Sequence, residues 1–290
     1  MPMSQPRRSP GGGRAVLITG CSSGIGRALA RGLAARGYRV FATARREADV
    51  AALAAEGFES HRLDLAEPDS IRTAVAAVLS AAGGRLHGLV NNGAYGQPGA
   101  VEDLSRAALR AQFETNVFGA QELTNCLLPA MRAAGAGRIV QISSLLGFVC
   151  LPFRGAYNAS KYALEALSDT LRLELAGSGI HVALIEPGPI RSRFRANAYR
   201  ALQAHVDIRR SPHRALYEAV MERLRAEADV PFTLPPEALL APVCHALEHR
   251  RPRTRYRVTV PARLLWPLKR LLPDRWLDAL VLRLGGEGRR

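Results

Sequence analysis

The sequence predicts an α/β fold in which a doubly wound, parallel sheet carries helices on both faces. Two observations predict it. Short apolar runs alternate regularly with longer amphipathic segments, and several of the runs are apolar at every position, as in parallel strands that are covered on both sides. Such an alternation is typical of a doubly wound sheet. The 290 residues show no internal repeat, so we expect a single domain with a C-terminal helical extension.

Each element follows from its own pattern. The apolar runs have the length of strands, and the segments between them are rich in Ala, Leu and Arg. A glycine stands shortly after each helical segment, where a helix can end in a left-handed residue. The expected strands are 15–19, 38–43, 61–65, 86–90, 138–143 and 181–186, and the expected helices are 24–36, 47–56, 68–82, 105–133 and 155–176. We expect a flexible tail over 1–13, a main domain over 14–260 and an amphipathic helical extension over 261–290.

Composition narrows the class of protein. With 48% apolar and 22% charged residues the chain can bury a core, which excludes disorder as the dominant state. No run reaches the roughly 18 apolar residues that a membrane-spanning helix needs, and no apolar signal segment follows the basic N-terminus, so we expect a cytoplasmic protein. The four scattered cysteines form no C-x-x-C pair and indicate neither a disulfide framework nor a metal site.

A glycine-rich loop, Thr19-Gly-Cys-Ser-Ser-Gly-Ile-Gly26, connects the first expected strand to the first helix. Its glycines allow a tight turn and a close approach to a pyrophosphate, and the helix N-terminus presents free N–H groups to it. The loop therefore predicts a dinucleotide site, although its spacing is not G-x-G-x-x-G and a purely structural turn is the alternative. The expected cofactor contacts in this loop are Gly20, Ser22, Ser23, Gly24, Ile25 and Gly26.

The end of the second expected strand indicates which dinucleotide binds. An NAD site would have an Asp or Glu there for the ribose hydroxyl, whereas this chain has Ala44-Arg45-Arg46. Because a guanidinium suits a 2′-phosphate, Arg45 favours NADP(H) over NAD(H). The alternative is that these arginines only begin a solvated helix. Asp64, after the third strand, is expected either to accept a hydrogen bond from the adenine or to cap its own loop.

The most specific pattern is Tyr157-Asn-Ala-Ser-Lys161. Four residues on a helix place the phenol and the ammonium on one face. We expect the positive charge to lower the pKa of Tyr157 from about 10 toward neutrality, which suits proton transfer. Only Lys161 and Lys269 are lysines in a chain of 40 basic residues. A compact ammonium is thus needed at position 161 where arginine would not serve.

Together these motifs resemble the short-chain dehydrogenase/reductase family over residues 14–260, and the layout is similar to its hydroxysteroid dehydrogenase, retinol dehydrogenase and carbonyl reductase members. The motifs occur in the family's order, namely the glycine loop, Asn91-Asn-Gly-Ala94, Asn116, Ser143-Ser144, Tyr157 to Lys161 and Pro187-Gly188. Two departures are Gly93-Ala94, where the family has Ala-Gly, and Ser192, where it has Thr.

The resemblance implies a Rossmann-type fold and four catalytic residues. Ser144 would hold the substrate carbonyl, Tyr157 would supply a proton to its oxygen, and Asn116 would help keep a water-linked proton path to Lys161. Further expected cofactor contacts are Asn91, Gly93, Tyr157, Lys161, Pro187, Gly188 and Ile190. The segment 189–235 would be a substrate lid.

The expected reaction is therefore NADPH-dependent reduction of an apolar aldehyde or ketone, or in reverse oxidation of an alcohol such as a steroid or retinol. The residues between Ser144 and Tyr157 favour a lipophilic substrate. They are Leu145, Leu146, Phe148, Val149, Leu151 and Phe153. The alternative is that about half of them are ordinary core.

The C-terminal third supports a second interpretation. Residues 186–290 carry a net charge of +10 of the chain's +15, and 264–284 mix Trp and Leu with basic residues. A non-enzymatic dinucleotide-binding protein could associate through this third with a membrane or nucleic acid. Because no nucleic-acid recognition motif is present and all four catalytic positions are filled, an enzyme is favoured. The structural alternative for 264–284 is an amphipathic helix that closes the core or forms a dimer interface. We expect a homo-oligomer.

Two further patterns predict no site. His245 and His249 lie on one helical face but lack a third ligand and the His-Glu-x-x-His order. Cys21 stands at a helix N-terminus, where the pKa of a thiol can fall, yet a small loop side chain is the preferred interpretation.

Overall fold

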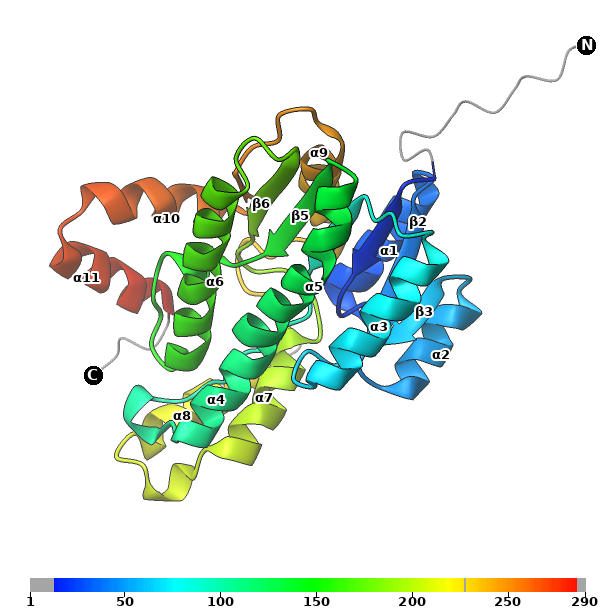
Figure 1. Ribbon diagram of the computed structural model, residues 1–290. Coiled ribbons are helices and arrows are strands. Elements are labelled where there is room, and N and C mark those ends of the chain that lie inside the picture. Colours follow the sequence, from blue (N-terminus) through cyan, green and yellow to red (C-terminus); the bar gives the residue numbers. More distant parts are fainter. Residues whose placement is uncertain (1–12, 227, 286–290) are drawn as a thin grey trace, which may run out of the picture.

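The structure is a computed structural model that describes residues 13–226 and 228–285. These residues form a seven-stranded parallel sheet with helices on both faces (Figure 1), which confirms the predicted fold class. Except for Gly13, the predicted tail lies outside the described residues, as do 286–290 of the predicted extension. The strands are β1 (Ala15–Ile18), β2 (Arg39–Ala44), β3 (Glu59–Arg62), β4 (Gly88–Asn91), β5 (Gly137–Ile142), β6 (Ile180–Glu186) and β7 (Arg255–Arg257).

Two helical layers cover the sheet because successive strand residues point to opposite faces. In β1, Val16 and Ile18 pack into one apolar cluster while Ala15 and Leu17 pack into the other. The first cluster contains α1 (Gly24–Ala35), α2 (Glu47–Ala55) and α9 (Leu240–Glu248). The second contains α3 (Pro68–Ala81), α5 (Gly119–Ala133) and α6 (Gly155–Glu174). A strand with both faces buried must be apolar throughout, which is the pattern that predicted it.

The order of the strands, β3-β2-β1-β4-β5-β6-β7, reverses direction at β1. The chain moves outward from β1 to β3 and then returns to place β4 on the other side of β1. In a doubly wound sheet this reversal leaves a crevice beyond the carboxyl ends of the two central strands, where ligands bind. The glycine loop follows β1, and Asn91 ends β4, so the topology places both at this crevice.

Most boundaries differ from the prediction by one or two residues, and two elements differ in kind or register. The single helix expected over 105–133 is α4 (Arg106–Phe113), a π-helical turn, η2 (Glu114–Phe118), and then α5. The third strand is β3 at 59–62 rather than 61–65. Residues 59–62 pair with β2, so of the predicted run only His61 and Arg62 belong to the strand.

The remaining helices gather over the carboxyl ends of the strands and beside α6. They are α7 (Phe194–His205), α8 (Arg214–Arg225), α10 (Val260–Leu271) and α11 (Asp274–Gly285), with short turns η1 (Val101–Asp103), η3 (Leu145–Gly147), η4 (Ile208–Arg210) and η5 (Pro236–Leu239). Figure 1 shows α7 and α8 next to α4, and α10 and α11 as a hairpin beyond α6. None of the helices in the described part of the chain is long and apolar enough to cross a membrane.

Candidate active site

The glycine loop bends sharply between β1 and α1. Gly20 has φ of 70°, a left-handed conformation that favours glycine. A Cβ on Gly26 would lie 2.3 Å from the carbonyl oxygen of Gly20, so only glycine fits there. Ser22 and Ser23 lead into α1, which begins at Gly24, and Ile25 packs on the core. The loop and the first N–H groups of α1 form a cradle that fits a pyrophosphate.

Thr19 joins this loop to the end of β4. Its hydroxyl oxygen accepts hydrogen bonds from the backbone N–H of Asn92, at 2.9 Å, and of Gly93, at 2.7 Å. The side-chain amide of Asn92 donates in turn to the carbonyl oxygen of Thr19, at 2.8 Å. Asn91 is buried, and its amide donates to Thr124 Oγ1 at 2.9 Å. These contacts bring the predicted residues Asn91 and Gly93 beside the glycine loop.

The end of β2 lies at the same crevice, since the N–H of Cys21 donates to the carbonyl oxygen of Thr43 at 2.8 Å. Arg45 follows and is exposed, with no ion pair to a carboxylate among the described residues. Arg46 is instead held by Asp49, with Nε to Oδ2 at 2.7 Å. Of the two arginines, Arg45 is therefore the one whose guanidinium is available to a phosphate.

Asp64 caps its own loop. Its Oδ1 accepts from the N–H of Ala66 at 3.0 Å, and its backbone N–H donates to Ser70 Oγ at 3.0 Å. This is one of the two roles that the sequence left open, and the adenine contact of Asp64 stays a prediction.

The catalytic candidates come from α6 and from the end of β5. Tyr157 and Lys161 share one face of α6, and Lys161 Nζ lies 5.7 Å from the centre of the Tyr157 ring. Lys161 is buried and donates to the carbonyl oxygen of Ile142 at 2.8 Å. Ser144 follows β5, and its hydroxyl lies close enough to Tyr157 to lower the pKa of that phenol. The structure thus brings Ser144, Tyr157 and Lys161 together.

Asn116 contacts this group through Ser160, the residue that precedes Lys161. Its Nδ2 donates to Ser160 Oγ at 3.1 Å and to the carbonyl oxygen of Tyr95 at 3.0 Å, and its Oδ1 accepts from the N–H of Tyr95. Ser160 directly precedes Lys161. Asn116 stands in the π-helical turn η2, a feature that frequently marks functional positions and that the sequence pattern did not predict.

The expectation of a lowered Tyr157 pKa is wrong in this structure. Burial raises the pKa of Tyr157 to about 12, and the hydrogen bond with Ser144 and the charge of Arg154 only partly oppose it. Burial also lowers the pKa of Lys161 to about 8, against the effect of Glu165. Loss of solvation, which disfavours the charged form of each group, exceeds the stabilisation that the pair was expected to provide. Tyr157 is accordingly a protonated phenol at neutral pH.

The loop after β6 is held from two sides. The N–H of Leu145 donates to the carbonyl oxygen of Pro187 at 2.8 Å, and the N–H of Gly188 donates to Thr259 Oγ1 at 3.0 Å. Ile190 forms an isolated bridge with Leu234, which closes the segment containing α7 and α8 back onto this loop. Pro187, Gly188 and Ile190 therefore border the crevice beside Ser144.

The wall beside Tyr157 is apolar, as the sequence suggested. Leu145, Leu146 and Val149 are buried in one cluster, which is the core packing that was the alternative for about half of these residues. Phe148, Leu151 and Tyr157 are partly buried and pack against that cluster. The prediction missed the other half of this wall, which comes from α10 and α11. Its buried members there are Ala262, Leu265, Leu277 and Val281. The C-terminal helices thus close this part of the core, which is one of the two interpretations left open for them.

Two aromatic residues, Phe153 and Phe194, lie outside this cluster. Phe153 packs in another cluster, with its ring centre 5.2 Å from that of Tyr217 on α8. Phe194, the first residue of α7, was not predicted as part of the site. Its ring meets that of Tyr157 edge to face at 5.2 Å, and a Cβ on Gly96 would lie 2.6 Å from its tip. Phe194 therefore lies directly on the catalytic candidate.

The two patterns set aside in the sequence have structural roles. Burial raises the pKa of Cys21 to about 12, and its thiol donates to the carbonyl oxygen of Ile18. The rings of His245 and His249 stack at 4.4 Å, and His245 Nδ1 is 2.7 Å from the Tyr256 hydroxyl. Within 13–226 and 228–285, no group of three or more His, Cys, Asp or Glu side chains could hold a metal ion.

Comparison with known proteins adds independent findings. The family model for short chain dehydrogenase matches residues 14–203. The chain is 43% identical to the uncharacterized oxidoreductase YbbO of Escherichia coli K12, over 92% of this chain and 94% of that protein. It is 32% identical to the NADPH-dependent 3-dehydrocapnine reductase of Ornithobacterium rhinotracheale, over 92% and 95%. It is 35% identical to human retinol dehydrogenase 16, over 92% and 87%.

A solved structure has the same fold. The short chain dehydrogenase/reductase of Burkholderia phymatum, in complex with NAD, superimposes with a TM-score of 0.73 at 26% sequence identity and covers 89% of this chain and 92% of its own.

Proposed function

We propose, from the premise that this chain belongs to the short-chain dehydrogenase/reductase family and is an NAD(P)-dependent oxidoreductase, that it reduces the carbonyl group of an apolar aldehyde or ketone. The observation that carries this proposal is the meeting of Ser144, Tyr157 and Lys161 against an apolar wall. The non-enzymatic alternative is not favoured, because it explains neither this group nor the wall.

The residues divide the work by their chemistry. Ser144 orients the carbonyl oxygen by a hydrogen bond, and the protonated phenol of Tyr157 donates its proton to that oxygen. A nearby Lys161 ammonium stabilises the phenolate that remains. In the reverse direction the phenolate accepts the proton of an alcohol. Asn116 fixes Ser160, and with it the turn of α6 that carries Lys161.

The crevice residues fit a nicotinamide dinucleotide. The loop ending at Gly26 would hold its pyrophosphate, and Asn91, Gly93 and the Pro187–Gly188 loop would border the nicotinamide half. When bound, the reduced cofactor supplies the hydride. We favour NADP(H) because Arg45 stands where an NAD site has a carboxylate. The relative from Ornithobacterium is named as NADPH-dependent, which supports this preference, whereas the Burkholderia structure contains NAD.

The substrate is inferred to be lipophilic. Tyr157 packs against apolar side chains from η3, α10 and α11, and its ring meets that of Phe194 of α7 edge to face. A polar substrate such as a sugar would leave its hydroxyl groups without partners against this wall. The relative named retinol dehydrogenase 16 is consistent with an apolar alcohol or aldehyde.

The reaction is tested with the full chain on a panel of medium-chain aldehydes, ketosteroids, retinal and quinones, each with NADPH and NADH. We expect turnover that Tyr157→Phe abolishes. Tyr162→Phe is the matched control, because Tyr162 lies on the same helix and is 37% exposed, outside the catalytic group. Equal turnover in wild type and Tyr157→Phe would falsify the assignment of Tyr157 as the acid.

Cofactor preference has its own test. Arg45→Asp should raise the KM for NADPH far more than the KM for NADH, because the introduced carboxylate repels a 2′-phosphate. Arg46→Asp is the matched control, since Arg46 already pairs with Asp49. Similar changes in both variants, or an unchanged preference in Arg45→Asp, would remove Arg45 from the cofactor site.

The α10–α11 hairpin also supports weak association with an anionic membrane. Leu264, Leu271 and Trp276 are 58%, 79% and 68% exposed, and Lys269 and Arg270 stand beside them. Apolar side chains flanked by cations suit a negatively charged bilayer surface. Co-sedimentation with anionic liposomes at low salt should decrease in a Leu264→Glu/Leu271→Glu/Trp276→Glu variant. No decrease would refute this association.

A further inference from the structure

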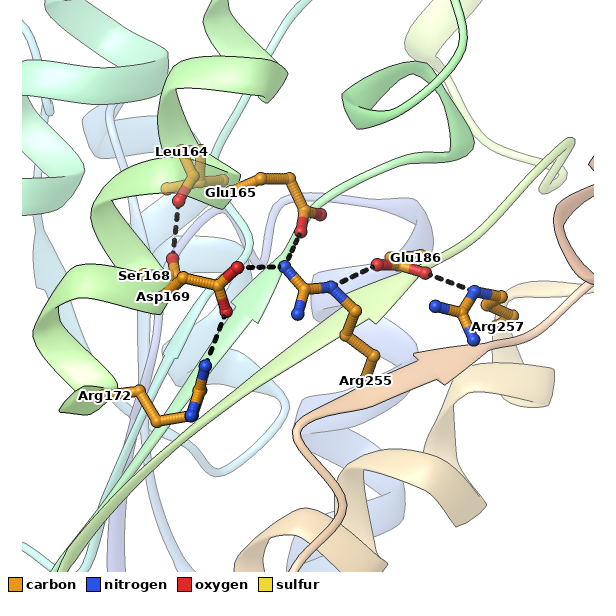
Figure 2. A network of polar contacts seen from close by, with 8 residues as sticks. All are labelled: Leu164, Glu165, Ser168, Asp169, Arg172, Glu186, Arg255 and Arg257. Atoms are coloured by element: carbon orange, nitrogen blue, oxygen red, sulfur yellow. Dashed lines mark hydrogen bonds and ion pairs between the residues drawn. The ribbon is translucent and has the colours of Figure 1, made fainter. Parts of the chain in front are cut away.

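A group of buried charges lies behind Lys161, outside the catalytic residues described above. Glu165 stands one turn after Lys161 on α6 and is 8% exposed, and Glu186 ends β6 and is 1% exposed. Arg255 of β7 lies between them (Figure 2), with Nη2 donating to Glu165 Oε2 at 3.0 Å and Nε at 3.0 Å from Glu186 Oε1. Arg257 holds the other oxygen of Glu186 at 3.0 Å.

Stability alone does not account for such a group. Removing charges from water costs several kcal/mol for each ion, and apolar side chains of similar volume often serve a buried position equally well. Burial raises the pKa of Glu165, and its contacts with Ser143 and Arg255 oppose this effect. Burial and Glu165 together raise the pKa of Glu186 to about 7. A group that is costly to bury and adjoins the catalytic lysine therefore suggests a role in the reaction.

The group adjoins two parts of the site, the helix turn that carries Lys161 and the loop that contains Pro187 and Gly188. Glu165 lies four residues from Lys161, on the same face of α6, and its charge opposes the effect of burial on the pKa of Lys161. Glu186 immediately precedes Pro187 and Gly188, the loop that borders the crevice. Arg255 binds both carboxylates, so one side chain links the helix of the lysine to the strand that ends in this loop.

We propose that Glu165 is a positioning residue for the reduction: its carboxylate, one turn from Lys161 on α6 and held by Arg255 at 3.0 Å, provides the negative charge beside the catalytic ammonium, while Arg255 ties the same helix to Glu186 and the Pro187 loop. The proposal rests on the proposed function. Lys161 is cationic over a useful pH range only if a negative charge offsets its burial, because the ammonium makes one hydrogen bond, to a backbone carbonyl, among the described residues.

The other charges around Lys161 do not substitute for Glu165. Asp169 lies one turn further along α6, with Oδ2 accepting from Arg255 Nη2 at 2.6 Å, and it also pairs with Arg172. Glu165 is one helical turn from Lys161 and Asp169 is two turns away, so the charge of Glu165 is the nearer of the two to the lysine. Asp169 thus provides a matched control, because it binds the same guanidinium from a position more remote from the lysine.

The test uses the two lysines of the chain. Protein labelled with carbon-13 at the lysine ε-carbon gives two NMR signals, of which exposed Lys269 is the internal reference. We expect Glu165→Gln to move the Lys161 titration to lower pH by about one unit, the effect of removing a nearby opposite charge. Asp169→Asn should leave it in place, and Lys269 should titrate alike in all samples. The alkaline limb of kcat for carbonyl reduction should move with Lys161.

The outcomes separate the two proposals. An unchanged Lys161 titration in Glu165→Gln, an equal displacement in Asp169→Asn, or a displaced titration without a displaced kcat limb would each overturn the role of Glu165. Absence of carbonyl reduction by the wild type would overturn the proposed function, and the NMR titration would still test Glu165. If Glu165→Gln does not fold, Glu165→Leu/Arg255→Leu removes the pair without leaving an uncompensated charge, and its Lys161 must titrate at lower pH than that of Arg255→Leu alone.

Discussion

Replacing Thr19 by valine removes the contact that joins the two cofactor loops while keeping the shape of the side chain. Thr19 is 1% exposed, and its oxygen accepts from the N–H groups of Asn92 and Gly93 at 2.9 and 2.7 Å. A buried donor left without a partner costs about 1–3 kcal/mol. Since both backbone groups are only half-buried, we expect the lower part of that range for each. The free energy of unfolding should fall by about 2–3 kcal/mol in total.

Urea denaturation measures this loss as a lower midpoint at unchanged slope. Thr19→Ser is the control, because it keeps the acceptor and removes one methyl group, which costs about 1 kcal/mol. The Val variant should also bind dinucleotide more weakly than the Ser variant, because Gly93 lies against Gly20 of the glycine loop. A Val variant as stable as the Ser variant would show that these two hydrogen bonds do not hold the loops together.

Three further expectations concern the cradle, the proton donor and the lid. Gly26→Ala should abolish measurable dinucleotide binding, because its Cβ would lie 2.3 Å from the Gly20 carbonyl oxygen; retained affinity in a binding titration would contradict the cradle. The rate of reduction should fall as the pH rises through about 8, where Lys161 loses its charge, and a flat profile to pH 10 would argue against a need for the ammonium. Phe194→Ala should lower kcat/KM for small apolar aldehydes by roughly tenfold, the equivalent of losing one aromatic contact, and an unchanged value would place Phe194 outside the substrate site.

The sequence was informative wherever a pattern is local. Alternating apolar runs predicted the strands, because parallel strands that are buried on both faces must be apolar throughout. The spacing of Tyr157 and Lys161 predicted a shared helical face, since that spacing is fixed by the helix itself. The glycine loop was predicted for a similar reason, as a turn against the start of a helix leaves no room for a Cβ at position 26.

Contacts between distant segments were not predictable in this way. Arg255 meets Glu165 across 90 residues, and nothing in the Arg-rich run 249–257 distinguished this arginine from its exposed neighbours. The π-helical turn at Asn116 interrupts a segment whose apolar pattern is continuous. The direction of the Tyr157 pKa was wrong for the same reason, because spacing shows the neighbouring charge but not how completely the surrounding protein excludes water from both groups.

Because α10 and α11 are the last helices of the chain, the apolar wall beside Tyr157 is synthesised later than the dinucleotide cradle. Every element of the dinucleotide cradle emerges from the ribosome in the first third of the chain, but the wall beside Tyr157 gains Leu265, Leu277 and Val281 only at the very end. A chain that is clipped before α10 therefore keeps every residue of the coenzyme cradle but lacks half of the apolar wall beside Tyr157. Proteolysis at this hairpin would therefore leave binding of the coenzyme in place while it lowers turnover of a lipophilic substrate.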